Sequence, residues 1–96
     1  MNEKQLAKLY YLKRLLNIYV RFLSGYDRFG LEYDDTTSMV KVKFYKTVDV
    51  VLSNGNPAVA DNTSESVFYI SNIGRVIAVY KFKLKTKFKN RHSWNG

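Results

Sequence analysis

The first two dozen residues place apolar side chains with the period of an α-helix. Asn2 can cap such a helix together with Gln5, and Gly25 can end it after Ser24, with no Pro or Gly between them. The sequence therefore predicts a helix from Asn2 to Ser24. Its apolar side chains fill an arc of about 200°, whereas packing on one sheet needs a stripe only somewhat over 100° wide.

The excess width predicts that the helix contacts something besides its own sheet. Long loops of the same chain are one candidate, and a homodimer interface or a groove for another partner is the other. We expect the contact to be made by the large apolar residues of the helix. The residues assigned to this protein interface are Leu9, Leu12, Leu16, Tyr19, Val20 and Leu23.

Beyond the helix the hydrophobic period shortens to two, as in β-strands. Residues 29–33 and 39–52 predict two strands that pair as a hairpin around a turn at 34–38. Residues 53–57 predict another turn, and residues 61–66 are polar enough to predict an exposed loop. This middle stretch is expected to lie outside the sheet.

The last third predicts two further strands, over residues 67–71 and 75–88. They flank the segment Asn72-Ile73-Gly74, where Gly74 can supply the positive φ of a short hairpin loop. The element order predicts an α+β fold: a long N-terminal helix packed on one face of a roughly four-stranded antiparallel sheet. Residues 1–89 then form a single domain, and residues 90–96 form a C-terminal tail.

The alternation along residues 80–89 is the most specific feature of the chain. As a strand, this segment would point Tyr80, Phe82 and Leu84 one way and its lysines the other way. The strand at 39–52 alternates similarly and would add two lysines to the same open face of the sheet. The expected lysine-lined sheet face contains Lys41, Lys43, Lys81, Lys83, Lys85, Lys87 and Lys89.

The charge of the chain is concentrated in the same region. Sixteen Lys and Arg against eight Asp and Glu give a net charge of +8. Residues 1–65 hold nine basic and eight acidic side chains, and residues 66–96 hold seven basic and none that are acidic. Such a surface indicates a polyanionic partner, which means nucleic acid, a nucleoprotein complex or an acidic protein. Lysines that simply keep an edge strand soluble are the alternative.

Aromatic side chains near these cations could stack on bases, as in single-strand binding proteins. Tyr45, Tyr69 and Trp94 are candidates, although the two tyrosines could equally be half-buried residues of the sheet. Arg75 lies just past the predicted hairpin turn, and Arg91 lies beside Trp94. The expected nucleic-acid-binding set is therefore the seven lysines with Arg75, Arg91, Tyr45 and Trp94.

Several functional classes find no support in the sequence. The chain has no cysteine, so a disulfide framework and thiolate-bound metals are excluded. Its single histidine, His92, lies in the predicted tail, and Asp34-Asp35 is typical of a turn, so we expect no enzyme activity, metal or cofactor. No stretch is long and apolar enough to span a membrane. The expected location is the cytoplasm, of a host cell if a phage or mobile element encodes the protein.

One short segment carries a resemblance. Phe68-Tyr69-Ile70-Ser71-Asn72-Ile73-Gly74-Arg75-Val76 resembles the Tyr-x-Val-Ser-Asn-x-Gly-Arg-Val hairpin of modular DNA-binding repeats attached to HNH-type homing endonucleases. It covers nine of the 96 residues and implies a hairpin within a DNA-binding unit. In size and in helix-then-sheet order the chain also looks like small accessory proteins of phages and mobile elements, including inhibitors of RNA-guided nucleases.

Two functional hypotheses follow. The first is a non-catalytic accessory protein that binds a nucleic-acid backbone, single-stranded or within a nucleoprotein complex, through the lysine-lined face. The second is a phage-type inhibitor that blocks a host nucleic-acid-processing complex such as an RNA-guided nuclease. In the second case the apolar face of the helix would dock on protein.

Overall fold

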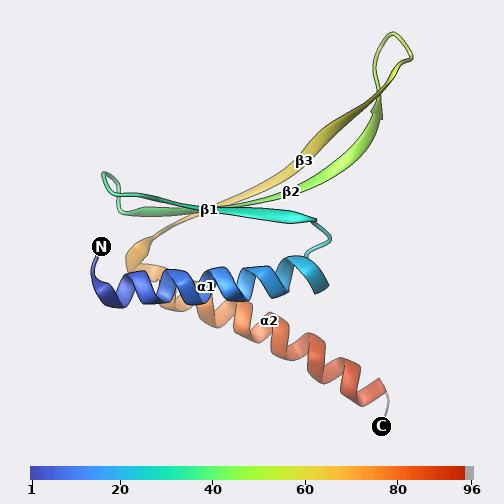
Figure 1. The fold of residues 1–96 in the computed structure, drawn as a ribbon. Helices are drawn as coiled ribbons and strands as arrows, with labels where there is room; N and C mark the ends of the chain where they lie inside the picture. The colour runs from blue at the N-terminus through green and yellow to red at the C-terminus, as the bar shows by residue number, and fades with distance from the viewer. Residues whose placement is uncertain (95–96) are drawn as a thin grey trace.

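The fold has two layers, a three-stranded sheet and a pair of helices. The computed structural model describes the backbone of residues 1–94 and the side chains of residues 1–88. Figure 1 shows the order of the elements along the chain. They are α1 (Glu3–Phe22), β1 (Arg28–Asp34), β2 (Met39–Val51), β3 (Pro57–Tyr69), the 3₁₀ turn η1 (Ile70–Asn72) and α2 (Ile73–Trp94).

Helix α1 begins and ends where the sequence predicts. The side chain of Asn2 accepts a hydrogen bond from the backbone N–H of Gln5 at 2.8 Å. In return, Gln5 Oε1 accepts from the N–H of Asn2 at 3.2 Å, which completes a capping box. Past the C-cap residue Leu23, Gly25 takes a φ of +75°, a conformation that glycine adopts without a Cβ clash.

The sheet is antiparallel, with strand order β1-β2-β3. The predicted hairpin of residues 29–33 and 39–52 is confirmed as β1 and β2, with Arg28 opposite Tyr45 and Asp34 opposite Met39. The α+β class is also confirmed, but the sheet has three strands among the described residues instead of four.

The predicted loop at residues 61–66 is wrong, because these residues belong to β3. This strand pairs with the whole of β2, from Met39 opposite Tyr69 to Val51 opposite Pro57. Its polar side chains stay exposed because β3 is an edge strand, which needs no apolar residue on every alternate position. The turn predicted at residues 53–57 is the tip of this hairpin, where Gly55 has a φ of +84°.

The predicted strand at residues 75–88 is also wrong, because this segment lies within helix α2. Gly74 lies in the first turn of the helix and is not among the residues with positive φ. The segment 68–76 therefore runs from β3 through η1 into α2, and it does not form the hairpin that the resemblance implies. Residues 90–94 of the predicted tail continue α2, while residues 95 and 96 lie outside the described part.

Helical spacing explains this outcome. The buried positions of α2 recur every three or four residues, whereas Phe82, which a strand would bury beside Tyr80, keeps 69% of its surface exposed. Of these positions, only Tyr80 and Leu84 also fit the period of two on which the predicted strand rested. The buried residues of η1 and α2 are Ile70, Ile73, Ile77, Tyr80 and Leu84.

The two helices account for the wide apolar arc of α1. One part of the arc packs under the sheet, against Val40, Val42 and Phe44 of β2, and another part packs against α2. The helices run side by side in the same direction, since a Cβ at Gly74 would lie 3.9 Å from Lys8 Nζ and the rings of Phe22 and Phe88 are 6.4 Å apart. The second contact of α1 is therefore a helix of the same chain.

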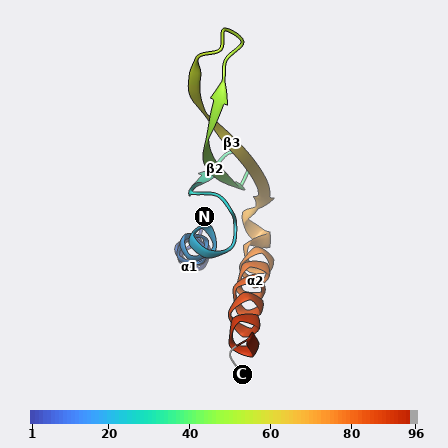
Figure 2. The same ribbon diagram turned by 90° about the vertical axis from the view of Figure 1, so that its right-hand side faces the viewer.

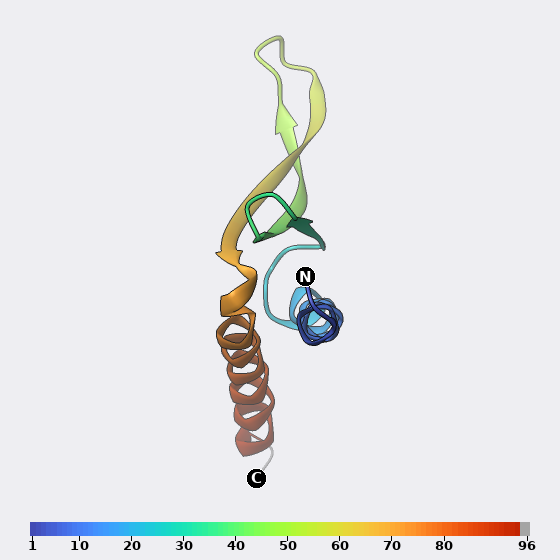
Figure 3. The same cartoon turned by 90° about the vertical axis from the view of Figure 1, so that its left-hand side faces the viewer.

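The β2–β3 hairpin extends well past the helical layer. Strand β1 pairs only with residues 39–45 of β2, so residues 46–62 form a two-stranded ribbon without a third strand (Figure 1). We refer to residues 46–62 as the arm. The views from the two sides show the arm rising from one end of the molecule while α2 runs away from it at the other (Figures 2 and 3). The molecule is thin, measuring 51 by 50 by 14 Å.

Candidate nucleic-acid interface

The fold separates the charges of the chain into two layers. Helix α1 carries five Lys and Arg against one Glu, and α2 carries seven Lys and Arg with no acidic residue. Residues 28–69, which contain the sheet, carry four Lys and Arg against six Asp and Glu. The positive charge therefore lies in the helical layer, and the sheet layer has a small acidic excess.

The lysines of α2 form two stripes along the helix. At about 100° per residue, positions 81 and 85 fall on one flank and positions 83 and 87 fall on the other. Within each pair the two positions are about 6 Å apart along the axis, given a rise of about 1.5 Å per residue. All four of these lysines are exposed. The predicted ladder on a single strand face is thus replaced by two stripes on a helix.

The first lysine of each stripe lies over aromatic rings: an exposed tyrosine of α1 in one case, and two tyrosines at the junction of the helices in the other. Lys81 Nζ lies 5.8 Å from the ring centroid of Tyr11. Lys83 Nζ lies 5.4 Å from the ring centroid of Tyr19 and 5.5 Å from that of Tyr80. Cation–π contacts at exposed sites contribute only about 0.5–1 kcal/mol, so an anion can draw these ammonium groups away at small cost.

The cavity beside Lys83 shows which way its stripe faces. It measures about 250 Å³ and lies between α2 and strand β3. Its lining is mainly apolar, so Lys83 supplies the only ammonium group there. The lining residues are Val42, Ser66, Val67, Phe68, Val76, Val79, Tyr80 and Lys83.

Two of the three lysines of β2, Lys41 and Lys43, already lie beside carboxylates or a tyrosine ring. Lys41 Nζ lies 3.5 Å from Glu65 Oε1, and Lys43 is paired across the strands with the same Glu65. Lys43 Nζ is also 5.4 Å from the ring centroid of Tyr45. Since Glu32 stands opposite Lys41, this face presents mixed charge to an incoming anion.

The ring of Tyr45 is likewise already in contact with cations. The guanidinium carbon of Arg28 lies 5.0 Å from its ring centroid, in addition to the ammonium group of Lys43. Arg28 donates hydrogen bonds to Asp27 at 3.0 Å and to Asp61 at 2.9 Å, which joins β1 to β3 across β2. A base would have to displace these cations before it could stack on Tyr45. The predicted stacking role of this residue stays a prediction.

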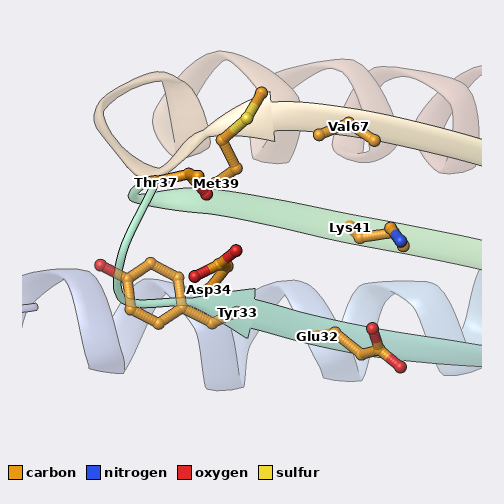
Figure 4. A pocket seen from close by; sticks show the side chains of 7 residues that line it. All are labelled: Glu32, Tyr33, Asp34, Thr37, Met39, Lys41 and Val67. Atoms are coloured by element: carbon orange, nitrogen blue, oxygen red, sulfur yellow. The ribbon is translucent and has the colours of Figure 1, made fainter.

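The open face of the sheet also has a shallow hollow of about 290 Å³ near the β1–β2 turn (Figure 4). Asp34 there accepts a hydrogen bond from the backbone N–H of Thr36 at 2.9 Å, which lowers the pKa of its carboxyl below the ordinary value. The hollow combines carboxylates with one lysine and is not a basic site. Its lining residues are Glu32, Tyr33, Asp34, Thr37, Met39, Lys41 and Val67.

The remaining residues that the sequence assigned to a nucleic-acid or protein interface lie in different parts of the fold. Arg75 is exposed in the first turn of α2, and Tyr69 is 55% exposed at the end of β3. The side chains of Lys89, Arg91 and Trp94 lie outside the described residues. The six residues that the sequence assigned to a protein interface all pack inside this chain. Tyr19 and Leu23 are partly buried neighbours of the core, and the other four are buried in it: Leu9, Leu12, Leu16 and Val20.

Sequence reasoning missed two features of the helical layer. The basic residues of α1 lie in the same layer as those of α2, although only the latter were assigned to a site. Phe82, which a strand would point to the same side as Tyr80 and Leu84, is exposed between the two lysine stripes. The wide apolar arc of α1 was the one sequence feature that could have indicated a second helix, because an arc of that width needs a packing partner besides the sheet.

No group of His, Cys, Asp and Glu side chains that could hold a metal ion occurs within the described part of the chain. Neither helix, as far as the structure describes it, is long and apolar enough to cross a membrane. Comparison of the chain with protein-family models, curated proteins and solved structures found no match.

Proposed function

We propose that this protein is a non-catalytic nucleic-acid-binding protein that holds the phosphate backbone with its helical layer. The observation that carries the proposal is the concentration of charge on α2, which has seven Lys and Arg and no acidic residue. Lysines contact phosphates without reading bases, so binding gains its free energy from counterion release and has little sequence preference. The sheet lysines, which lie beside carboxylates, contribute little.

A salt-dependent titration tests this proposal. Anisotropy of a labelled oligonucleotide of about 20 nucleotides, measured between about 50 and 200 mM salt, should give a slope of log K against log salt of about −3 to −4 if four lysines of α2 each neutralise one phosphate. Binding that does not change with salt would contradict the proposal.

Two matched double variants locate the site. Lys85→Glu with Lys87→Glu reverses two exposed lysines of α2, and Lys41→Glu with Lys43→Glu makes the same change of net charge on the sheet. We expect the first pair to weaken binding at least tenfold and the second pair to weaken it less than threefold. Equal losses would place the nucleic acid on both layers and refute a site confined to the helices.

The arm favours a second candidate function, an interaction with a protein that processes nucleic acid. Val51 and Val59 keep 75% and 69% of their surface exposed, and Leu52 keeps 48%. The arm carries one lysine against two aspartates, a balance that suits protein better than a phosphate backbone. An inhibitor that blocks a host complex would use both surfaces, α2 for the nucleic-acid channel and the arm for protein.

A photo-crosslinker at Val51 tests this candidate. An adduct with one nucleic-acid-processing protein, lost in a Val59→Asp variant that keeps its oligonucleotide affinity, would support it. Adducts with oligonucleotide alone would refute it.

A further inference from the structure

The outer strip of α2 lies between the two lysine stripes. The buried residues Ile73, Ile77, Tyr80 and Leu84 define the inner side of the helix. The opposite side, at about 100° per residue, is centred on Arg75, Phe82 and Thr86. All three side chains are exposed, Phe82 over 69% of its surface, so this strip faces solvent.

The lysine stripes flank that strip almost symmetrically. Positions 81 and 85 lie about 80–120° from the centre of the strip on one side, and positions 83 and 87 lie about 80–120° from it on the other. Both first lysines contact a ring of α1, Tyr11 for Lys81 and Tyr19 for Lys83, but of the two lysines only Lys83 also lines the cavity against β3. A single strand following one stripe would leave the other stripe unused.

We infer that α2 inserts into the major groove of duplex DNA, with its outer strip toward the base edges and its two lysine stripes on the phosphates of opposite strands. The major groove of B-DNA is about 12 Å wide and accepts an α-helix, whose diameter with side chains is about 10–12 Å. The inference rests on the proposed function and specifies its substrate as a duplex. The deep and narrow major groove of A-form RNA would exclude the helix.

The position of α2 in the fold permits this insertion. The sheet and α1 cover the inner side of the helix, and β3 borders the flank that carries Val79 and Lys83. The views from the two sides show α2 running away from the sheet, so the outer strip stays uncovered (Figures 2 and 3). By the same spacing Arg75 also lies on this strip, which therefore offers a phenyl ring, a hydroxyl group and a single guanidinium that can pair with one guanine at most. We therefore expect groove binding with weak sequence preference.

Groove occupancy tests the inference with the unaltered protein. One duplex of about 20 base pairs is compared with the same duplex carrying glucosylated 5-hydroxymethylcytosine, whose sugars fill the major groove and leave the backbone charge unchanged. We expect at least a tenfold loss of affinity for the glucosylated duplex, and less than a twofold change when netropsin occupies the minor groove. Equal affinity for both duplexes overturns the inference.

A pair of variants gives a second measurement. Phe82→Glu places a carboxylate on the outer strip, and Val59→Glu makes the same change at the same exposed fraction, 69%, on the distant arm. Duplex affinity should fall at least tenfold in the first variant and less than threefold in the second. Equal effects would overturn the inference, because both variants lower the net charge equally.

The two stripes also separate duplex from single strand. Lys81→Gln with Lys85→Gln and Lys83→Gln with Lys87→Gln should each reduce the salt slope on duplex DNA by about 2. If only one pair matters, the DNA follows one stripe; the inference then fails and the proposed function stands. If neither a duplex, a single strand nor double-stranded RNA binds at all, both fail.

Discussion

Tyr19 of α1 meets Tyr80 of α2 edge to face, with ring centroids 4.9 Å apart and ring planes at 70°. Tyr19 also lies 5.6 Å from the ring of Phe44 on β2, so one side chain joins both helices and the sheet. Edge-to-face pairs contribute about 0.5–1.5 kcal/mol beyond the burial of their area. This contact is one of those that hold α2, and with it the exposed lysines, against α1.

Replacing Tyr80 should therefore weaken the whole fold. We expect Tyr80→Ala to lower the free energy of unfolding by about 3 kcal/mol, since it removes a buried aromatic ring from the junction of helices and sheet. Tyr10→Ala is the control, because Tyr10 is 63% exposed and should change stability by less than about 0.5 kcal/mol. Urea unfolding followed by circular dichroism measures both, and similar losses in the two variants would contradict the assigned core.

Replacing Gly25 and Gly30 by alanine should change the stability of the fold in opposite directions. Gly25 has a φ of +75°, so Gly25→Ala should cost about 1 kcal/mol although nothing lies within 4 Å of the added Cβ. Gly30 lies in β1, and a Cβ there would meet the ring of Tyr45 at an ordinary distance of 3.8 Å. Gly30→Ala should be neutral or stabilising by up to about 1 kcal/mol. Thermal unfolding compares them, and destabilisation of both by the same amount would disprove the expectation.

Asp27 should stabilise the fold only above acid pH. The backbone N–H of Thr47, which donates to its carboxylate at 3.0 Å, lowers the pKa of Asp27 below the ordinary 3.8, with a further contribution from Arg28. Because the native pKa is the lower one, this stabilisation is present above the unfolded-state value and is lost as pH falls through the native value.

Carboxyl NMR titration measures this pKa directly. In Arg28→Gln the pKa of Asp27 should rise but stay below 3.8, because the hydrogen bond from Thr47 is the larger cause. A native value at or above 3.8 would rule out the bond. Asp27→Asn should reduce the loss of stability on acidification.

The arm should exchange its amide hydrogens faster than the rest of the sheet. Residues 39–45 of β2 pair with strands on both sides and lie over α1, whereas residues 46–51 pair with β3 alone. An isolated two-stranded hairpin is marginally stable in water, so the arm should open locally without global unfolding. Hydrogen exchange by NMR checks this, and uniform protection along β2 would show that the arm is not an independent unit.

The local elements of the N-terminal half could be predicted because each has one dominant signal. Asn2 with Gln5 specifies the start of α1, and alternating apolar residues specify β1 and β2. Most of strand β3 was missed, since only residues 67–69 of the strand predicted at 67–71 belong to it. Its middle is held by backbone hydrogen bonds to β2, and residues such as Thr63 and Ser64 have no apolar pattern that reveals the pairing. For the candidate site, the sequence indicated the lysines at positions 81–87 but not their arrangement on a helix.

The sequence by itself determined the composition of the basic segment, its lack of acidic residues and the apolar width of α1. It did not determine whether residues 75–88 form a strand or a helix, because Tyr80, Leu84 and Phe88 fit both a period of two and a helical period. Only the tertiary structure decided this, since the wide apolar face of α1 is covered by Ile73, Ile77, Tyr80 and Leu84 when they lie on one side of a helix. That packing turned a row of lysines into two stripes and moved the positive charge from the sheet to the helices.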